Sequence, residues 1–350
     1  MANLKSLAKD TAIYGLSSIA ARFVNYLLVP IQTTKFNAAG GQYGIITNVY
    51  AYVALLIVLL TYGMETTFFR FMSKEGEDPN KVYATTLKMV GTTSVIFMAI
   101  ILLFNQPIAN FLGYADHPEY ITIMYMTVAI DAFAAIPFAY LRCKHRPIKF
   151  AVLKILNISL NIVLNLLYLI ILPSLKLNLF GIYDAHFTLD VVWVFYINLI
   201  CTIITLLLLW KELYGIRYSF DKSTCKRMLS YTFPLLIMGL AGQLNQCASQ
   251  IIFPYVYNGT AEEARTQLGI YGACIKIAMI MVMITQAFRY AYEPFVFGKS
   301  KDRDNKDTYA KAMKFYIIFT LLAFLTVMGY MDVLRHVVGR SYWDGLEIVP

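Results

Sequence analysis

Long apolar segments separated by short polar connections dominate the chain. A tenth segment begins near Tyr342, after segments near residues 11–32, 44–67, 83–104, 120–141, 150–172, 190–210, 230–254, 268–292 and 310–331. About 20 consecutive apolar residues is the length of a helix that crosses the hydrocarbon core of a bilayer. The pattern therefore predicts an all-α polytopic membrane protein. No connection is long enough to form a folded domain outside the membrane.

Composition supports a membrane protein and excludes other classes. The chain has 350 residues, of which 59% are hydrophobic and only 15% are charged, whereas soluble domains carry about 25% charged residues. A net charge of +9 would suggest nucleic acid in a soluble protein, but in a membrane protein it indicates basic cytoplasmic loops. The five Cys and four His are scattered without metal-ligand spacing, so we expect no metal, no cofactor and no nucleic-acid partner.

Lys and Arg are distributed unequally between alternate loops. One set of loops, which includes the N-terminus, carries 20 of these residues, and the other set carries 5. Cytoplasmic loops are enriched in Lys and Arg, so the first set is predicted to be cytoplasmic. We therefore expect a multi-pass membrane protein with a cytoplasmic N-terminus.

A weak internal repeat relates the first and seventh apolar segments. Residues 27–30 (LLVP) match 251–254 (IIFP), residues 42–44 (QYG) match 267–269 (QLG), and residues 71–74 (FMSK) match 297–299 (FGK). The offset stays between 224 and 226, and six helices separate the copies. An even number of helices preserves orientation, which predicts two parallel six-helix halves with a cavity between them.

The repeat sets the expected domain organisation. Residues 1–220 would form the N-terminal six-helix bundle, and residues 221–350 would begin the C-terminal bundle with helices 7–9 and the start of helix 10. A second half of matching length would extend beyond Pro350, so we expect the second half to be incomplete.

Four charged residues lie deep inside apolar segments, near the predicted helix centres. A charge near the bilayer centre costs about 2.5–3.5 kcal/mol on insertion scales, so each should face protein or water. Three cations against one acid would make the interior electropositive, which suits phosphate and disfavours a cationic drug. Pairing among the charges or with backbone carbonyls is the structural alternative. The residues are Arg22, Asp131, Lys154 and Lys276.

Polar stripes run along the first and seventh helices. Ser18, Arg22 and Asn25 share one face at i, i+4 and i+7, and the seventh helix carries Gln243, Gln246 and Gln250 at i, i+3 and i+7. Such stripes can line a substrate cavity or join helices by hydrogen bonds between amides. Their occurrence on repeat-related helices favours the cavity.

The fifth helix carries a third polar stripe. Lys154, Asn157, Asn161 and Asn165 lie at i, i+3, i+7 and i+11, so one cation is followed by amides on a single face. Amides in this arrangement suit sugar hydroxyls, but hydrogen bonding inside the first bundle explains the same residues. We therefore keep Lys154, Asn157 and Asn161 as candidate substrate-binding residues beside that alternative.

Prolines and charge pairs suggest structural or gating positions. Pro30 and Pro254 occupy matching places in the repeat, where each would remove a helix hydrogen bond and allow a bend. Arg289 and Glu293 can pair at i, i+4 near the cytoplasmic end of the eighth helix. The equivalent end of the second helix carries Glu65 and Arg70, and a structural latch is the favoured interpretation of both pairs.

Short motifs along the chain resemble a known family. The motifs are Tyr43-Gly44, Gly63-Met64-Glu65, Phe68-Phe69-Arg70-Phe71, Glu293-Pro294-Phe295 and Tyr342-Trp343-Asp344-Gly345. With these residues the chain resembles the bacterial polysaccharide-biosynthesis flippases. They form the O-antigen (Wzx-type) branch of the MATE-like (multidrug/oligosaccharidyl-lipid/polysaccharide) exporter superfamily.

The resemblance implies a transporter of two helix bundles and not an enzyme. Such a flippase moves a polyprenyl-pyrophosphate-linked oligosaccharide across the bacterial cytoplasmic membrane for surface polysaccharide such as lipopolysaccharide, capsule or exopolysaccharide. In this chain Arg22, Lys276 and Lys154 would neutralise the pyrophosphate. Sugar hydroxyls would bind the neighbouring amides Asn25, Asn157, Asn161, Gln243 and Gln246.

One departure from the family concerns ion coupling. The seventh helix carries Gln250 where relatives often have an acid. Asp131 is then the remaining deep carboxylate that could bind a coupling proton or sodium ion.

Two other functions remain as alternatives. A cation-coupled multidrug antiporter of the same fold would need acids along its cavity. A membrane glycosyltransferase would need a carboxylate motif in a large outer loop, and this chain offers acids there only in short loops.

Overall fold

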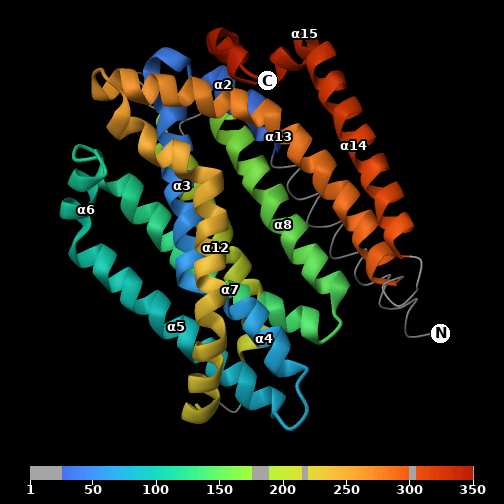
Figure 1. Cartoon of the computed structure of the whole chain (residues 1–350). Helices are drawn as coiled ribbons and strands as arrows, with labels where there is room; N and C mark the ends of the chain where they lie inside the picture. The colour runs from blue at the N-terminus through green and yellow to red at the C-terminus, as the bar shows by residue number, and fades with distance from the viewer. Residues whose placement is uncertain (1–25, 176–188, 215–219, 299–304, 350) are drawn as a thin grey trace.

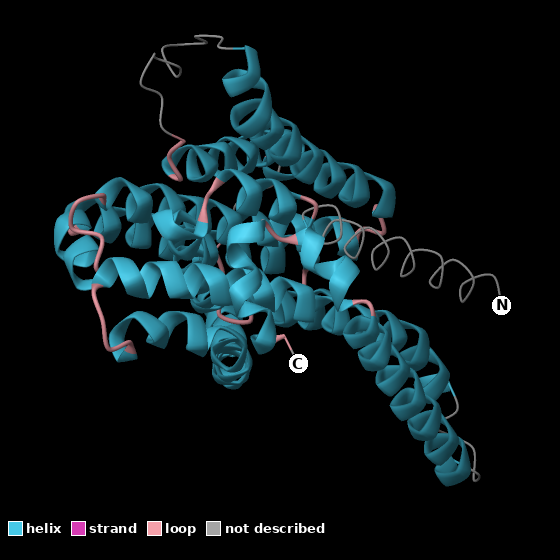
Figure 2. Ribbon diagram, turned by 90° about the horizontal axis from the view of Figure 1, so that it is seen from above, coloured by secondary structure: helices cyan, strands magenta, loops and turns pink. Residues whose placement is uncertain are grey.

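The computed structural model describes residues 26–175, 189–214, 220–298 and 305–349 of the chain (Figure 1). Side chains are described in these ranges except at 283–298, 305–309 and 311–312. Within the described part, regular structure is entirely helical and no residue lies in a strand (Figure 2). The all-α prediction is confirmed.

The helices follow one another with short connections. The first part of the chain contains α2 (Leu28–Lys35), η1 (Ala38–Gly40), α3 (Gln42–Thr61), α4 (Met64–Met72), α5 (Pro79–Leu103), α6 (Asn105–Phe111), α7 (Pro118–Cys143), α8 (Pro147–Leu166), the π-helical η2 (Leu167–Ile171), α9 (Leu172–Leu175), α10 (Val192–Leu208) and α11 (Trp210–Leu213). The remainder contains α12 (Lys222–Val256), α13 (Ala261–Gly298), α14 (Asn305–Gly329), α15 (Met331–Leu334), η3 (Arg335–Val337) and η4 (Arg340–Ile348).

The predicted apolar segments from 44–67 to 310–331 coincide with helices, while most of 11–32 lies outside the described residues. The tenth segment is the 3₁₀-helix η4. By length and apolar composition alone, four described helical segments could cross a membrane, or five if a bent pair counts as one span. Helix α10 is not among these segments because it has only 17 residues. Helix α12 is not among them either, because its glutamines lower its apolar character.

Local sequence explains where several helices begin and end. The Asp78 side chain accepts a hydrogen bond from the Asn80 N–H at 2.9 Å, and Pro79 occupies the first turn of α5. Between α3 and α4 the backbone turns at Tyr62 and Gly63, both at positive φ. A Cβ at Gly63 would also lie 2.9 Å from the Leu235 Cβ, so glycine is required here for both conformation and space.

Helix α3 lies at the centre of the molecule and packs against α7, α12 and α13 (Figure 1). Its crossing with α13 occurs at two glycines, since a Cβ on Gly269 would lie 3.0 Å from the Gly44 nitrogen. Small residues allow such close approach of membrane helices. Gly44 and Gly269 are also partners in the predicted repeat, so positions that the repeat makes equivalent contact each other.

The segment around η4 joins α2 to α13. Tyr342 is fully buried, and its hydroxyl donates a hydrogen bond to the Phe36 carbonyl at 2.6 Å. The Gly339 N–H donates to the Thr33 hydroxyl at 2.9 Å, and the Cys274 thiol contacts the Tyr342 carbonyl at 3.6 Å. These contacts hold the chain between α15 and residue 349 against the predicted outer end of the helices.

Helices α13 and α14 form a hairpin that projects away from the other helices in both views (Figures 1 and 2). The domain boundary predicted at residue 220 falls between α11 and α12. It remains a prediction.

Candidate transport cavity

A cavity of about 530 Å³ lies between helices α2, α3, α8, α10, α12 and α13. Polar and apolar side chains both contribute to its walls. The predicted substrate-binding residues that line it are Asn157, Asn161, Gln243, Gln246 and Lys276. Five residues from α8 and from the consecutive helices α12 and α13 therefore border one space.

The cavity lies beside the crossing of α3 and α13, which stay in close contact as far as Gly272, where a Cβ would collide with the Thr47 side chain. On α3, Thr47, Ala51 and Ala54 share one face and line the cavity with small side chains. The facing side of α13 carries Gly272 and, four residues later, Lys276. The same helix face that permits close packing at one end thus brings a cation into the cavity one turn further along.

Lys276 is the cation of the described cavity wall. Its backbone carbonyl accepts a hydrogen bond from the Tyr26 hydroxyl at 2.7 Å, which connects α13 to the chain just before α2. Among the described residues, no side chain forms a hydrogen bond or ion pair with the Lys276 ammonium. The described lining contains no Asp or Glu. An anionic group is therefore the complementary ligand.

The α12 glutamines form the second wall. Gln246 is exposed and Gln243 half-buried, and both line the cavity together with Gln250. The Gln250 carbonyl accepts a hydrogen bond from the Asn48 side chain at 2.8 Å, which fixes α12 to α3. Because this contact uses the Gln250 backbone, α12 is held to α3 without use of the Gln250 side chain.

The asparagines of α8 divide between the two predicted roles. Asn157 donates to the Thr205 hydroxyl at 2.6 Å although it also borders the cavity. Asn165 is buried and donates to the Asn161 carbonyl at 2.8 Å. The third, Asn161, lines the cavity. Hydrogen bonding within the bundle and cavity lining are therefore both present on one stripe.

Lys154 of α8 and Asp131 of α7 do not line the cavity. The Lys154 ammonium is 4.3 Å from the centre of the Phe138 ring. Asp131 accepts a hydrogen bond from the Thr202 hydroxyl at 3.2 Å. One turn before Thr202, Asn198 donates to the Tyr50 hydroxyl at 2.8 Å, and both of these last residues line the cavity. A row of polar side chains on α10 thus runs from Asp131 toward the cavity.

The predicted structural residues contact partners other than those expected. Glu65 pairs with Arg142 of α7 at 2.6 Å, whereas the Arg70 guanidinium lies 4.2 Å from the centre of the Tyr231 ring on α12. Glu65 therefore joins α4 to α7, and Arg70 joins α4 to α12.

The structure describes the positions of the two predicted prolines, but only the backbone of the predicted charge pair on α13. Pro30 lies in the first turn of α2, just after a turn at Leu27, and Pro254 lies near the end of α12. The side chains of Arg289 and Glu293 lie outside the described residues, although their backbone belongs to α13.

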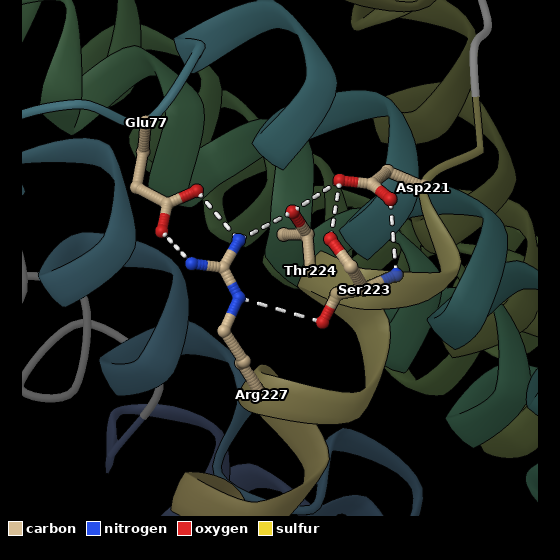
Figure 3. A network of polar contacts seen from close by, with 5 residues as sticks. All are labelled: Glu77, Asp221, Ser223, Thr224 and Arg227. Carbon is tan, nitrogen blue, oxygen red and sulfur yellow. Dashed lines mark hydrogen bonds and ion pairs between the residues drawn. The ribbon is translucent and has the colours of Figure 1, made fainter.

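A polar network at the start of α12 joins the two predicted halves at the end that the sequence predicts to be cytoplasmic (Figure 3). The Arg227 guanidinium contacts both carboxylate oxygens of Glu77, one of them at 3.0 Å, and also the Thr224 hydroxyl. Hydrogen bonds from Thr224 and Ser223 hold the pKa of Asp221 below its usual range. The α12 end of the cavity wall is thereby fixed to the α4–α5 connection.

Arg22 and Asn25 lie outside the described residues, so their predicted roles remain predictions. Cavity-lining residues that we did not predict include Gln32, Asn198 and Tyr50. Gln32 follows Asn25 at i+7, and extending the first polar stripe beyond Pro30 would have found it. Asn198 stands alone in an apolar segment and gives no such signal.

Solved structures share this fold. The chain aligns with an inward-facing multidrug resistance MATE family transporter of the MOP superfamily over 97% of its own length and 75% of that protein, with 16% identity and a TM-score of 0.63. The MATE multidrug transporter DinF-BH aligns with a TM-score of 0.64 at 15% identity, covering 99% of this chain and 81% of that one. At these identities the likeness shows the fold alone.

Sequence comparison identifies the family. Among curated protein sequences, none matches this chain at a significant level. The profile of the family described as "Polysaccharide biosynthesis protein" matches residues 7–291, which is most of the chain. The chain is therefore a membrane protein of the polysaccharide biosynthesis family with the fold of MATE transporters.

Proposed function

We propose that the protein is a flippase that moves a polyprenyl-pyrophosphate-linked oligosaccharide across the bacterial cytoplasmic membrane for surface polysaccharide synthesis. The observation that carries the proposal is the cavity between α3, α8, α12 and α13, with one lysine and several amides on its described walls and no carboxylate among them. A pyrophosphate needs a cation, and sugar hydroxyls need donors and acceptors such as amides. Both kinds of group are present side by side.

Each part of the substrate would have its own place. Lys276, and Arg22 from the N-terminal segment, would neutralise the pyrophosphate. The glycan would contact Gln243, Gln246 and Asn161, and the polyprenyl tail would remain in lipid. Lys154 would not contact the pyrophosphate directly and would contribute its positive charge from between the helices, because its ammonium lies over Phe138 and Lys154 does not line the cavity.

Transport would require alternating access between the two leaflets. Relative movement of the halves would use Pro30 and Pro254 as bending points. Asp131 would bind the coupling proton or sodium ion and act on the cavity through the polar row on α10. The distribution of Lys and Arg supports a cytoplasmic N-terminus, so the Glu77–Arg227 contact would close the inner end.

The test is deletion of the gene followed by mass spectrometry of cytoplasmic-membrane lipids. We expect a polyprenyl-pyrophosphate oligosaccharide to accumulate in the inner leaflet while surface polysaccharide falls. Complementation with Arg22→Ala should fail although the protein is expressed. Unchanged lipids with an intact surface glycan, or full complementation by the Arg22→Ala variant, would contradict the respective assignments.

A second candidate function is a cation-coupled multidrug antiporter. It is favoured by the shared fold with solved multidrug transporters. The described cavity wall argues against it, since a lysine without a neighbouring acid repels cationic drugs. Efflux of a cationic dye by cells that express the protein would support this function over the flippase.

A further inference from the structure

A groove of about 350 Å³ lies between α13 and the bent segment that begins with α14. Helix α14 and the following residues, Met331–Val337, meet at an angle of 62° around Tyr330. Ile280 of α13 borders the groove on one side, and α14 contributes residues between Phe319 and Val327. Tyr330 and Leu334 border it at the bend. The volume lies within the range of ordinary ligand sites, about 300–1,000 Å³.

The described lining of this groove offers a ligand almost only hydrocarbon. It contains no charged residue, and the Thr326 hydroxyl already donates a hydrogen bond to the Leu322 carbonyl at 2.7 Å. Ala323 and Val327 are buried, whereas Leu322 and Tyr330 at the edge are 60% and 63% exposed. Apart from the Tyr330 hydroxyl, the lining therefore suits a chain without polar groups.

The groove lies on a part of the molecule that contacts lipid. The hairpin of α13 and α14 projects away from the other helices in both views (Figures 1 and 2). Together with the segment after the bend, α14 is long and apolar enough to cross a bilayer. Other apolar side chains of α14 are exposed beside the groove, among them Ile318, Leu321 and Leu325. A hydrocarbon chain can therefore enter the groove from the membrane without passing through water.

The groove and the transport cavity border neighbouring positions of α13. Lys276 lines the cavity, and Ile280, at i+4 on the same side of the helix, lines the groove. One such step is about 6 Å along a helix. A lipid whose pyrophosphate contacts Lys276 would thus have the beginning of its tail beside Ile280.

We propose that this groove binds the first isoprene units of the polyprenyl tail while the pyrophosphate occupies the cavity. The inference rests on the proposed function and assigns a site to a part of that substrate. The stretch from Phe319 to Tyr330 extends about 16 Å, so a short part of the tail fits and the rest stays in lipid. The tail is favoured over a phospholipid chain because a pyrophosphate bound at Lys276 holds its own tail close to the groove.

The test measures binding of undecaprenyl pyrophosphate to the detergent-solubilised protein by microscale thermophoresis. Leu322→Trp, which fills the groove from its edge, should weaken binding about fivefold, since a tail that leaves lipid gains only packing contacts. Leu325→Trp is the matched control, because it makes the same change at a similarly exposed position of α14 that does not line the groove. This control should bind like the wild-type protein. Inorganic pyrophosphate, which has no tail, should bind equally to all three proteins.

Lys276→Gln distinguishes failure of this inference from failure of the proposed function. It should weaken binding of both undecaprenyl pyrophosphate and inorganic pyrophosphate. If it does so while Leu322→Trp binds undecaprenyl pyrophosphate like Leu325→Trp, the groove does not hold the tail and the proposed function stands. Equal weakening of dioleoylphosphatidylglycerol binding by Leu322→Trp would also overturn the inference, since the groove would then take any lipid chain. Wild-type affinities with Lys276→Gln would overturn both.

Discussion

Two lysines in apolar helices have different surroundings, although they give the same signal in the sequence. Lys276 lines the cavity, where the described wall offers it no acid. Lys154 of α8 does not line the cavity, and its ammonium lies over the Phe138 ring of α7. The difference follows from position, because Lys276 lies on the face of α13 that borders the cavity, whereas Lys154 lies on a face of α8 that contacts α7. Whether an intramembrane lysine is accessible to a ligand thus depends on whether its face of the helix borders a cavity.

The largest effect is expected from Lys276→Gln. Loss of a charge-assisted hydrogen bond to pyrophosphate, worth about 1.5–3 kcal/mol, should lower transport about 10- to 100-fold. The measurement is translocation of a fluorescent polyprenyl-pyrophosphate oligosaccharide in proteoliposomes. Lys276→Arg should restore a substantial part of the rate. Equal rates for Lys276→Gln and the wild-type protein would show that the lysine does not bind the substrate.

The next largest effect should come from Gly44→Ala at the helix crossing. The added methyl would collide with the Arg265 carbonyl, so we expect a loss of about 1–3 kcal/mol in stability and displacement of α13 together with Lys276. A thermal unfolding midpoint in detergent measures this loss. Gly242→Ala is the matched control, since a Cβ there meets no atom within 4 Å. If both variants unfold at the same temperature, the crossing does not fix the cavity.

The variant Lys154→Gln should show that the two lysines have different roles. Its main expected effect is on stability, about 1–2 kcal/mol from the lost cation–π contact, with transport within about threefold of the wild-type rate. The same thermal and proteoliposome measurements apply. A transport defect as large as that of Lys276→Gln would place Lys154 in direct contact with the substrate and remove the distinction.

The smallest effect is expected from Glu77→Gln at the start of α12. Because Arg227 is partly exposed, the bidentate contact should contribute about 1 kcal/mol or less to stability, with little change in transport. Glu75→Gln, an exposed change in the same connection, is the control. A double-mutant cycle with Arg227→Gln measures the coupling. A coupling energy of zero would mean that this contact does not fix α12.

Much of the fold could be predicted from the sequence, because each segment of about 20 apolar residues has few alternatives to a helix. The repeat did not predict which helices meet, and the contact between the repeat-related residues Gly44 and Gly269 is visible only in the structure. Partners of individual side chains could not be predicted. Arg70 contacts Tyr231 and Glu65 contacts Arg142, since helix rotation and the neighbouring helix decide these contacts.

The candidate site could be predicted only in part, because helix rotation and the neighbouring helix also decide which faces line a cavity. The spacing of Gln243 and Gln246 gives a shared face, and that face does line the cavity. The i, i+3, i+7 pattern on α8 gives a face as well, but whether it faces a cavity or another helix depends on how α8 and α10 pack, as the Asn157–Thr205 contact shows.

The most direct measurement compares the two lysines in cells that lack the chromosomal gene. Strains complemented with wild-type protein, Lys276→Gln or Lys154→Gln would be analysed by mass spectrometry for lipid-linked oligosaccharide in the inner leaflet, with surface polysaccharide measured in parallel. The account predicts accumulation and loss of surface glycan with Lys276→Gln, and nearly wild-type lipids with Lys154→Gln. Normal lipids with Lys276→Gln, or equal accumulation with both variants, would contradict it.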